Sequence, residues 1–133
     1  MATANGLNDL GVPPEVAKRT GYQEVSVTTA GTTQGSTGGV LSGPGNKLVL
    51  ATIHSSNGAV TLPANAEKGD EIIVANVTGT AGLVFPQSGG NINGNTTDSG
   101  TATLAAQGSA GSNWRFVKLN ATRWAGWSGA DQS

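Results

Sequence analysis

The sequence predicts an all-β fold, a small β-sandwich or barrel of jelly-roll-like type, with a short helical arm at its N-terminus. Short runs rich in Val, Thr and Ile recur along the chain, and clusters of Gly, Ser, Asn and Pro separate them. The 21 glycines suit tight turns between such strands. Roughly seven to nine short strands at regular spacing are typical of a sandwich or a barrel.

The composition of the chain changes along its length and divides it into three parts. These are an N-terminal arm with a short helix (residues 1–21), a strand followed by a Gly/Thr/Ser-rich linker (22–46) and the β-domain (47–133). In the arm, Pro13 and Pro14 suit the first turn of a helix, and Gly21 suits its end. A helix of about two turns is not stable alone, so it must dock, either on its own domain or on a partner.

The strongest strand pattern covers residues 47–53, which are apolar on both faces. This predicts a central position in a sheet or a subunit contact. Residues 22–29 alternate more weakly and predict an earlier strand. The Asn57-Gly58 pair is a hairpin signal that would join the strong strand to residues 59–62, where Pro63 ends the pairing.

The remaining strands are predicted at residues 71–77, 83–85, 101–105, 114–119 and 122–127. An Asn120-Ala121 turn joins the last two into a pair, and all three tryptophans lie in it. In the core or at a subunit contact, these tryptophans would supply much of the buried area of a chain with few aromatics. If exposed, they would stack on sugar rings, as in a carbohydrate-binding module. The sequence leaves both interpretations open.

The composition also narrows the class of protein. A chain of 133 residues suits one domain, or one domain with an arm. Its net charge is −1 and its basic residues are scattered, which argues against a nucleic-acid partner. Without cysteine it has no disulfides or thiolate metal sites, which fits assembly in a reducing cytoplasm. No segment resembles a signal peptide or approaches the ~20 apolar residues of a membrane span, so no membrane partner is expected.

No set of residues in the sequence indicates catalysis. The one histidine, His54, has no nearby carboxylate or cysteine to complete a zinc site. Asp70 belongs to a Gly-Asp turn, and adjacent residues of a strand point to opposite faces. Asp70 and Glu71 are therefore not expected to form a pair of catalytic carboxylates. The glycine-rich stretches lack the G-K-[ST] ending of a phosphate loop, and no G-x-S-x-G motif is present. We therefore predict that the chain is not an enzyme and takes no cofactor or metal.

Several short motifs resemble a β-module found on the outside of tailed-bacteriophage particles, in capsid decoration (cement or head-fibre) proteins and tail-fibre beads. These motifs are V-T-L-P, G-D-E-I-I-V-A-N, L-V-F-P-Q-S-G-G-N-I-N-G and the closing W-R-F-V-K-L-N-A-T-R-W-A-G-W. The arm, L-N-D-L-G-V-P-P-E-V-A-K-R, looks like the leading segment of head-decoration proteins, with a G-x-P-P-E-x-A centre. Its matching residues are Gly11, Pro13, Pro14, Glu15 and Ala17.

The resemblance implies a cement protein on the outer capsid surface of the virion, made in the host cytoplasm, with the major capsid protein as its partner. It also implies a homotrimer. The alternative is a tail-fibre or baseplate β-module that binds a receptor or a glycan. The resemblance implies a capsid contact, and we assign it to the apolar and proline residues of the arm, Leu7, Leu10, Val12, Pro13, Pro14 and Val16. We assign the oligomer contact to Leu48, Val49, Leu50 and Ile53 of the strong strand.

Overall fold

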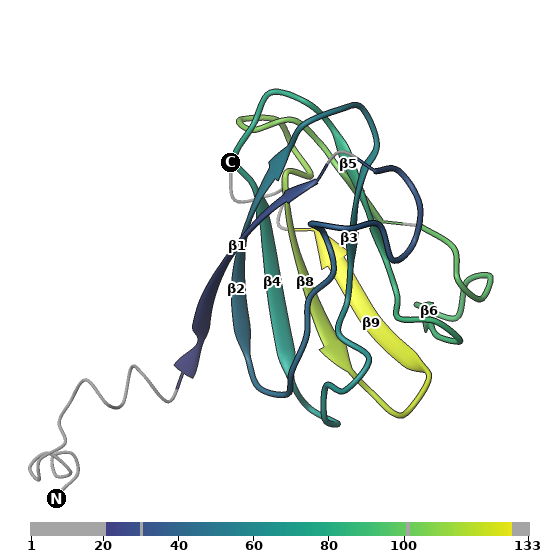
Figure 1. Ribbon diagram of the computed structural model, residues 1–133. Coiled ribbons are helices and arrows are strands. Elements are labelled where there is room, and N and C mark those ends of the chain that lie inside the picture. Colours follow the sequence, from purple (N-terminus) through teal and green to yellow (C-terminus); the bar gives the residue numbers. More distant parts are fainter. Residues whose placement is uncertain (1–20, 30, 101, 129–133) are drawn as a thin grey trace, which may run out of the picture.

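The computed structural model describes residues 21–29, 31–100 and 102–128. All secondary-structure elements of these residues are β-strands, in two sheets, which confirms a β-rich fold (Figure 1). The strands are β1 Gln23–Thr29, β2 Lys47–Ile53, β3 Gly58–Thr61, β4 Glu71–Asn76, β5 Gly82–Phe85, β6 Asn91–Ile92, β7 Ala102–Leu104, β8 Asn113–Lys118 and β9 Arg123–Ser128. The assigned arm residues, from Leu7 to Val16, lie outside the described residues.

The chain passes back and forth between the two sheets. The large sheet has the order β1-β2-β4-β8-β9-β6, and the small sheet has the order β3-β5-β7. Strands β1, β2 and β4 are parallel neighbours, as are β3 and β5. Each parallel neighbour is reached by crossing to the other sheet and back, as parallel pairing requires a crossover. The first half of the chain therefore winds around a shared core.

The Asn57-Gly58 signal marks a turn, but the predicted hairpin is wrong. Strand β3 pairs in parallel with β5 in the small sheet, and β2 pairs with β1 and β4 in the large sheet. The reason lies in the backbone: a type I′ hairpin needs positive φ at both central residues, and here only Asn57, at φ 63°, has it. The turn is a corner between sheets. Gly58 fits there because a Cβ would lie 2.2 Å from Thr29 Oγ1.

The Gly/Thr/Ser-rich segment 31–46 contributes to the domain rather than only linking its strands. Val40 forms a parallel bridge to Thr61 at the edge of the small sheet, and Leu41, only 2% exposed, enters the core. Gly39 permits this close approach, since a Cβ there would lie 2.0 Å from the carbonyl oxygen of Ala59. The segment thus adds one more pass along the small sheet.

The inward-facing residues of both sheets form one apolar cluster. Its largest side chain is Trp124, which is fully buried and donates from Nε1 to Gln87 Oε1 at 2.7 Å. Trp114 is partly buried and stacks on Phe116, whereas Trp127 is 47% exposed. The three tryptophans therefore divide between the core and the surface, although they lie in one strand pair.

Candidate interaction surfaces

The face of the large sheet that points away from the core carries a continuous row of side chains. Strand register places Leu48 beside Ile73, Ile73 beside Arg115, and Arg115 opposite Trp127. Glu24 of β1 extends the row at one edge, next to Leu48. We call these five residues the outer row. They come from five neighbouring strands, so the sheet holds them on a rigid frame.

Exposed large hydrophobic residues lie in the outer row and beside it. Leu48 is 37% exposed, Trp127 47% and the neighbouring Tyr22 41%. Val77 and Leu119, which directly follow β4 and β8, are also exposed. Scattered exposed apolar residues are ordinary, but contiguous ones mark contact surfaces. Among the large hydrophobic residues described as exposed, Val40 is the exception, because it belongs to the small sheet.

A polar network fixes two side chains at the outer row. The Glu71 carboxylate accepts a hydrogen bond from the Tyr22 hydroxyl at 2.5 Å and pairs with Arg115 Nε at 2.6 Å. The hydrogen bond to Glu71, then burial, raises the pKa of Tyr22 above its usual value. Tyrosine, tryptophan and arginine are the residues that most often anchor protein interfaces. The outer row is therefore suited to binding another protein.

The structure divides the residues that we assigned to the oligomer contact. Leu48 and Leu50 lie on the outward face of β2, whereas Val49 and Ile53 are buried in the core, at 0% and 3% exposure. Of the four assigned residues, only Leu48 and Leu50 are therefore placed to take part in a subunit contact through this face. Our assignment did not include Tyr22, Arg115 or Trp127. The alternation of residues 114–119 already placed Arg115 and Val117 on one face, but nothing local showed that this face was outward.

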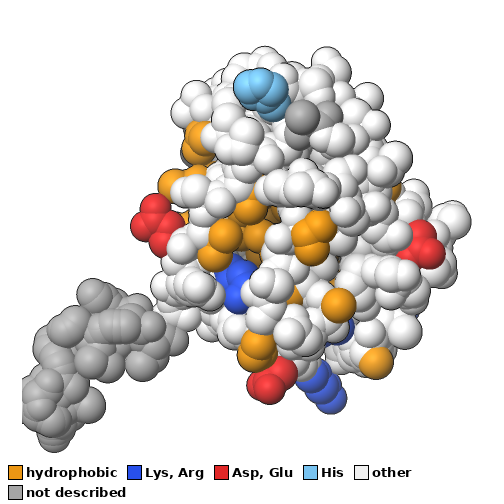
Figure 2. Space-filling model, in the orientation of Figure 1, with side chains coloured by type: hydrophobic (Ala, Val, Ile, Leu, Met, Phe, Trp, Pro, Cys, Tyr) orange, Lys and Arg blue, Asp and Glu red, His pale blue; other side chains and the backbone are white. Residues whose placement is uncertain are grey.

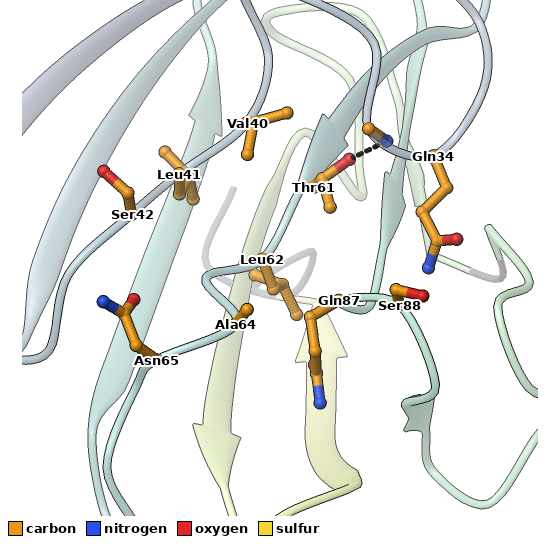
Figure 3. Close-up of a pocket in the computed structure, with 11 residues that line it drawn as sticks. Gln34, Val40, Leu41, Ser42, Thr61, Leu62, Ala64, Asn65, Gln87 and Ser88 are labelled. Carbon is orange, nitrogen blue, oxygen red and sulfur yellow. Dashed lines mark hydrogen bonds between the residues drawn. The ribbon is translucent and has the colours of Figure 1, made fainter.

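A second feature is a hollow beside strand β3, at the edge of the small sheet, with a volume of about 650 Å³. Figure 2 shows apolar side chains gathered near the centre of this side of the molecule. The hollow lies where residues 40–42 run beside residues 61–65, and Gln87 lies next to Leu62 at its lower side, with its side chain pointing away (Figure 3). Its lining consists of Gln34, Gly35, Val40, Leu41, Ser42, Thr61, Leu62, Ala64, Asn65, Gln87 and Ser88.

No protein family model, curated protein or solved structure matches this chain.

The polar residues that were considered as candidates for a catalytic or metal site are either bound to structural partners or far from one another. Asp70 Oδ2 accepts from the backbone N–H groups of Gly45 and Glu67, each at 2.7 Å, and so holds two loops together. Glu71 belongs to the network at the outer row, and His54 is exposed after the end of β2. Within the described residues, no group of His, Asp or Glu side chains is arranged to hold a metal ion. In the same part of the chain, no helix is long and apolar enough to cross a membrane.

Proposed function

We propose that this chain is a structural, non-catalytic β-module that binds the outer surface of a tailed-phage head and stabilises the junctions between capsomers. The observation that carries the proposal is the outer row, which combines exposed apolar, aromatic and charged side chains on the face of the large sheet that points away from the apolar cluster. Such a surface gains stability by being covered. The sequence motifs, which resemble those of capsid decoration proteins, supply the identity of the partner: the major capsid protein.

Self-association into a homotrimer is part of this proposal. Glu24 stands at the β1 edge of the large sheet and Arg123 lies on β9, near its other side. Opposite charges at the two sides favour contact between unlike ends of neighbouring copies, which is the arrangement that closes into rings. A ring with three-fold symmetry presents the same surface to each capsid subunit that it touches. Several weak contacts then act together through high effective concentration.

For the finer architecture, we propose a β-sandwich. The single apolar cluster drawn from both sheets supports it, because two sheets that face each other share one core. The parallel pairs β1-β2 and β2-β4 differ from the antiparallel Greek keys of a jelly roll, so we propose no closer likeness to that type.

Phage heads test the proposed role directly. Heads that lack this protein are expected to assemble normally but to release DNA at a lower temperature than decorated heads. The physical reason is that each bridging copy must dissociate before the junction opens, and a contact of micromolar affinity contributes about 8 kcal/mol at the 1 M standard state. DNA release on heating, followed with an intercalating dye, measures the difference. Equal release temperatures with and without the protein would remove the cement role.

The N-terminal arm has its own test. Deleting residues 1–20 is expected to leave the β-domain folded, because the described strands of both sheets already share one apolar cluster. If the arm grips the capsid, co-sedimentation of the truncated chain with expanded heads should fall about tenfold or more. Circular dichroism of the truncated chain is the folding control. Undiminished decoration by the truncated chain would assign the capsid contact to the β-domain instead.

The second candidate is a tail-fibre or baseplate β-module that binds a glycan. The observation in its favour is that Tyr22 and Trp127 present exposed aromatic rings, at 41% and 47% exposure. Glycan-array binding that is lost in Trp127→Ala, with no binding to heads, would support this candidate over the cement role.

A further inference from the structure

One arginine of the outer row is held in place and still has hydrogen-bond donors available. Arg115 Nε pairs with one carboxylate oxygen of Glu71 at 2.6 Å, and the Tyr22 hydroxyl donates to the other oxygen at 2.5 Å. A guanidinium group carries five N–H donors, and one carboxylate occupies at most two of them. At least three donors of Arg115 therefore remain for a second acceptor, on a side chain that is 50% exposed.

The surroundings of Arg115 suit a second carboxylate. Trp127, 47% exposed, lies directly opposite Arg115 on β9, and Ile73 lies beside it on β4. A carboxylate on Arg115 would be flanked by these two side chains and partly shielded from water, which strengthens its attraction to the guanidinium group. Because Glu71 already fixes the guanidinium group, little conformational entropy is lost when the carboxylate binds.

The outer row itself contains a carboxylate without a described partner. Glu24 is exposed on β1, at one edge of the large sheet, and neither a hydrogen bond nor an ion pair joins its side chain to another described residue. Strands β2 and β4 separate β1 from β8 (Figure 1). Three strand spacings, about 14 Å, therefore keep Glu24 from Arg115 of the same copy. In a ring, the β1 side of one copy faces the β9 side of the next, where Arg115 is within reach of Glu24.

The register of the large sheet distinguishes Arg115 from Arg123, which is also exposed on this face. Glu24 stands in the same row as Arg115 and Trp127. Arg123 is four residues from Trp127 along β9, a distance of about 13 Å. In a ring whose symmetry axis runs along the strands, neighbouring copies are rotated but not shifted along that axis. Glu24 of one copy then meets the next copy at the height of Arg115.

We propose that Glu24 of one copy binds Arg115 of the next copy, beside Trp127, and that this ion pair determines which surfaces of neighbouring copies meet. The inference rests on the proposed self-association and names its polar contact. Each copy supplies one carboxylate and one guanidinium group, so a closed ring leaves neither group without a partner.

Variants of the full chain test the pair, with sedimentation equilibrium as the measure of self-association. Glu24→Gln and Arg115→Gln are each expected to weaken the contact between copies about tenfold, because each leaves one charge at the contact without its partner. The double variant Glu24→Gln/Arg115→Gln should be no weaker than either single variant, since a direct pair is already lost in each of them. Circular dichroism of every variant is the folding control.

Two further variants are matched controls. Glu67→Gln and Arg123→Gln each neutralise an exposed charge outside the outer row, and both should keep the dissociation constant of the unmodified chain within about twofold. If the unmodified chain does not associate, the proposed self-association fails and the pair fails with it. If the chain associates, three results overturn the pair alone: no effect of Arg115→Gln, a larger effect of Arg123→Gln, or single effects that multiply to about 100-fold in the double variant.

Discussion

Replacing Trp124 with alanine is expected to remove a large part of the stability of the domain. Trp124 is the largest fully buried side chain among the described residues, and it packs in the cluster that both sheets share. Truncating a buried tryptophan to alanine costs about 3–5 kcal/mol. The whole stability of a domain is typically about 5–15 kcal/mol, so this substitution alone removes a large part of it.

The substitution also removes the interactions that Trp124 makes with two polar side chains. Gln87, 6% exposed, would lose the donor at 2.7 Å from its Oε1, and a buried polar group without a partner costs about 1–3 kcal/mol more. The ammonium group of Lys118 lies 5.1 Å from the ring centroid and would lose that contact. Burial of Lys118 disfavours the charged form of its side chain and so lowers its pKa.

Urea unfolding followed by circular dichroism measures this effect. Trp127→Ala provides the matched control, because it removes the same side chain from a position that is 47% exposed. The free energy of unfolding of Trp127→Ala should differ from that of the unmodified chain by about 0.5 kcal/mol or less, when both are measured as monomers. An unfolding midpoint of Trp124→Ala close to that of Trp127→Ala would show that the core does not depend on this residue.

Much of the strand content could be predicted from the sequence, because it depends on local pattern. The prediction for residues 47–53 matches β2, and the last two predicted strands form the antiparallel pair β8-β9 around the Asn120-Ala121 turn. Their pairing is local, so the turn determines it. By contrast, β1, β2 and β4 are joined across the other sheet, and no local signal specifies which strand each will contact. Non-local parallel pairing therefore could not be predicted.

The candidate site was predictable to the same extent. The alternation of β2 separates Leu48 and Leu50 from Val49 and Ile53, but both sets are apolar, so the sequence could not show which set faces inward. The small sheet packs against one face of the large sheet, and this packing determines which set of side chains is buried. Trp127 and Trp124 lie on opposite faces of β9 for the same reason, and their roles became distinct only once the strand was placed.

Substituting Leu48 and Trp127 with aspartate together is expected to abolish self-association of the protein. Both side chains belong to the outer row, at 37% and 47% exposure, and both would be covered when neighbouring copies meet. A charge buried at an interface without a partner is strongly unfavourable, and loss of an aromatic anchor alone often costs 2 kcal/mol or more. We expect self-association to weaken at least about 100-fold, which corresponds to about 2.7 kcal/mol.

Sedimentation velocity at micromolar concentration compares the mass of the unmodified chain, expected as a trimer, with that of the double variant, expected as a single chain. Val40→Asp is the control, because it also replaces an exposed aliphatic residue with aspartate, but on the small sheet, and should keep the trimer mass. If the unmodified chain sediments as a single chain, the outer row is not a self-contact, and its apolar surface must be covered by a different protein. If Val40→Asp dissociates the trimer and the double variant does not, the contact lies on the small sheet. The two aspartate variants thus distinguish the two faces of the domain, since each introduces its charge on one sheet and leaves the other sheet unchanged.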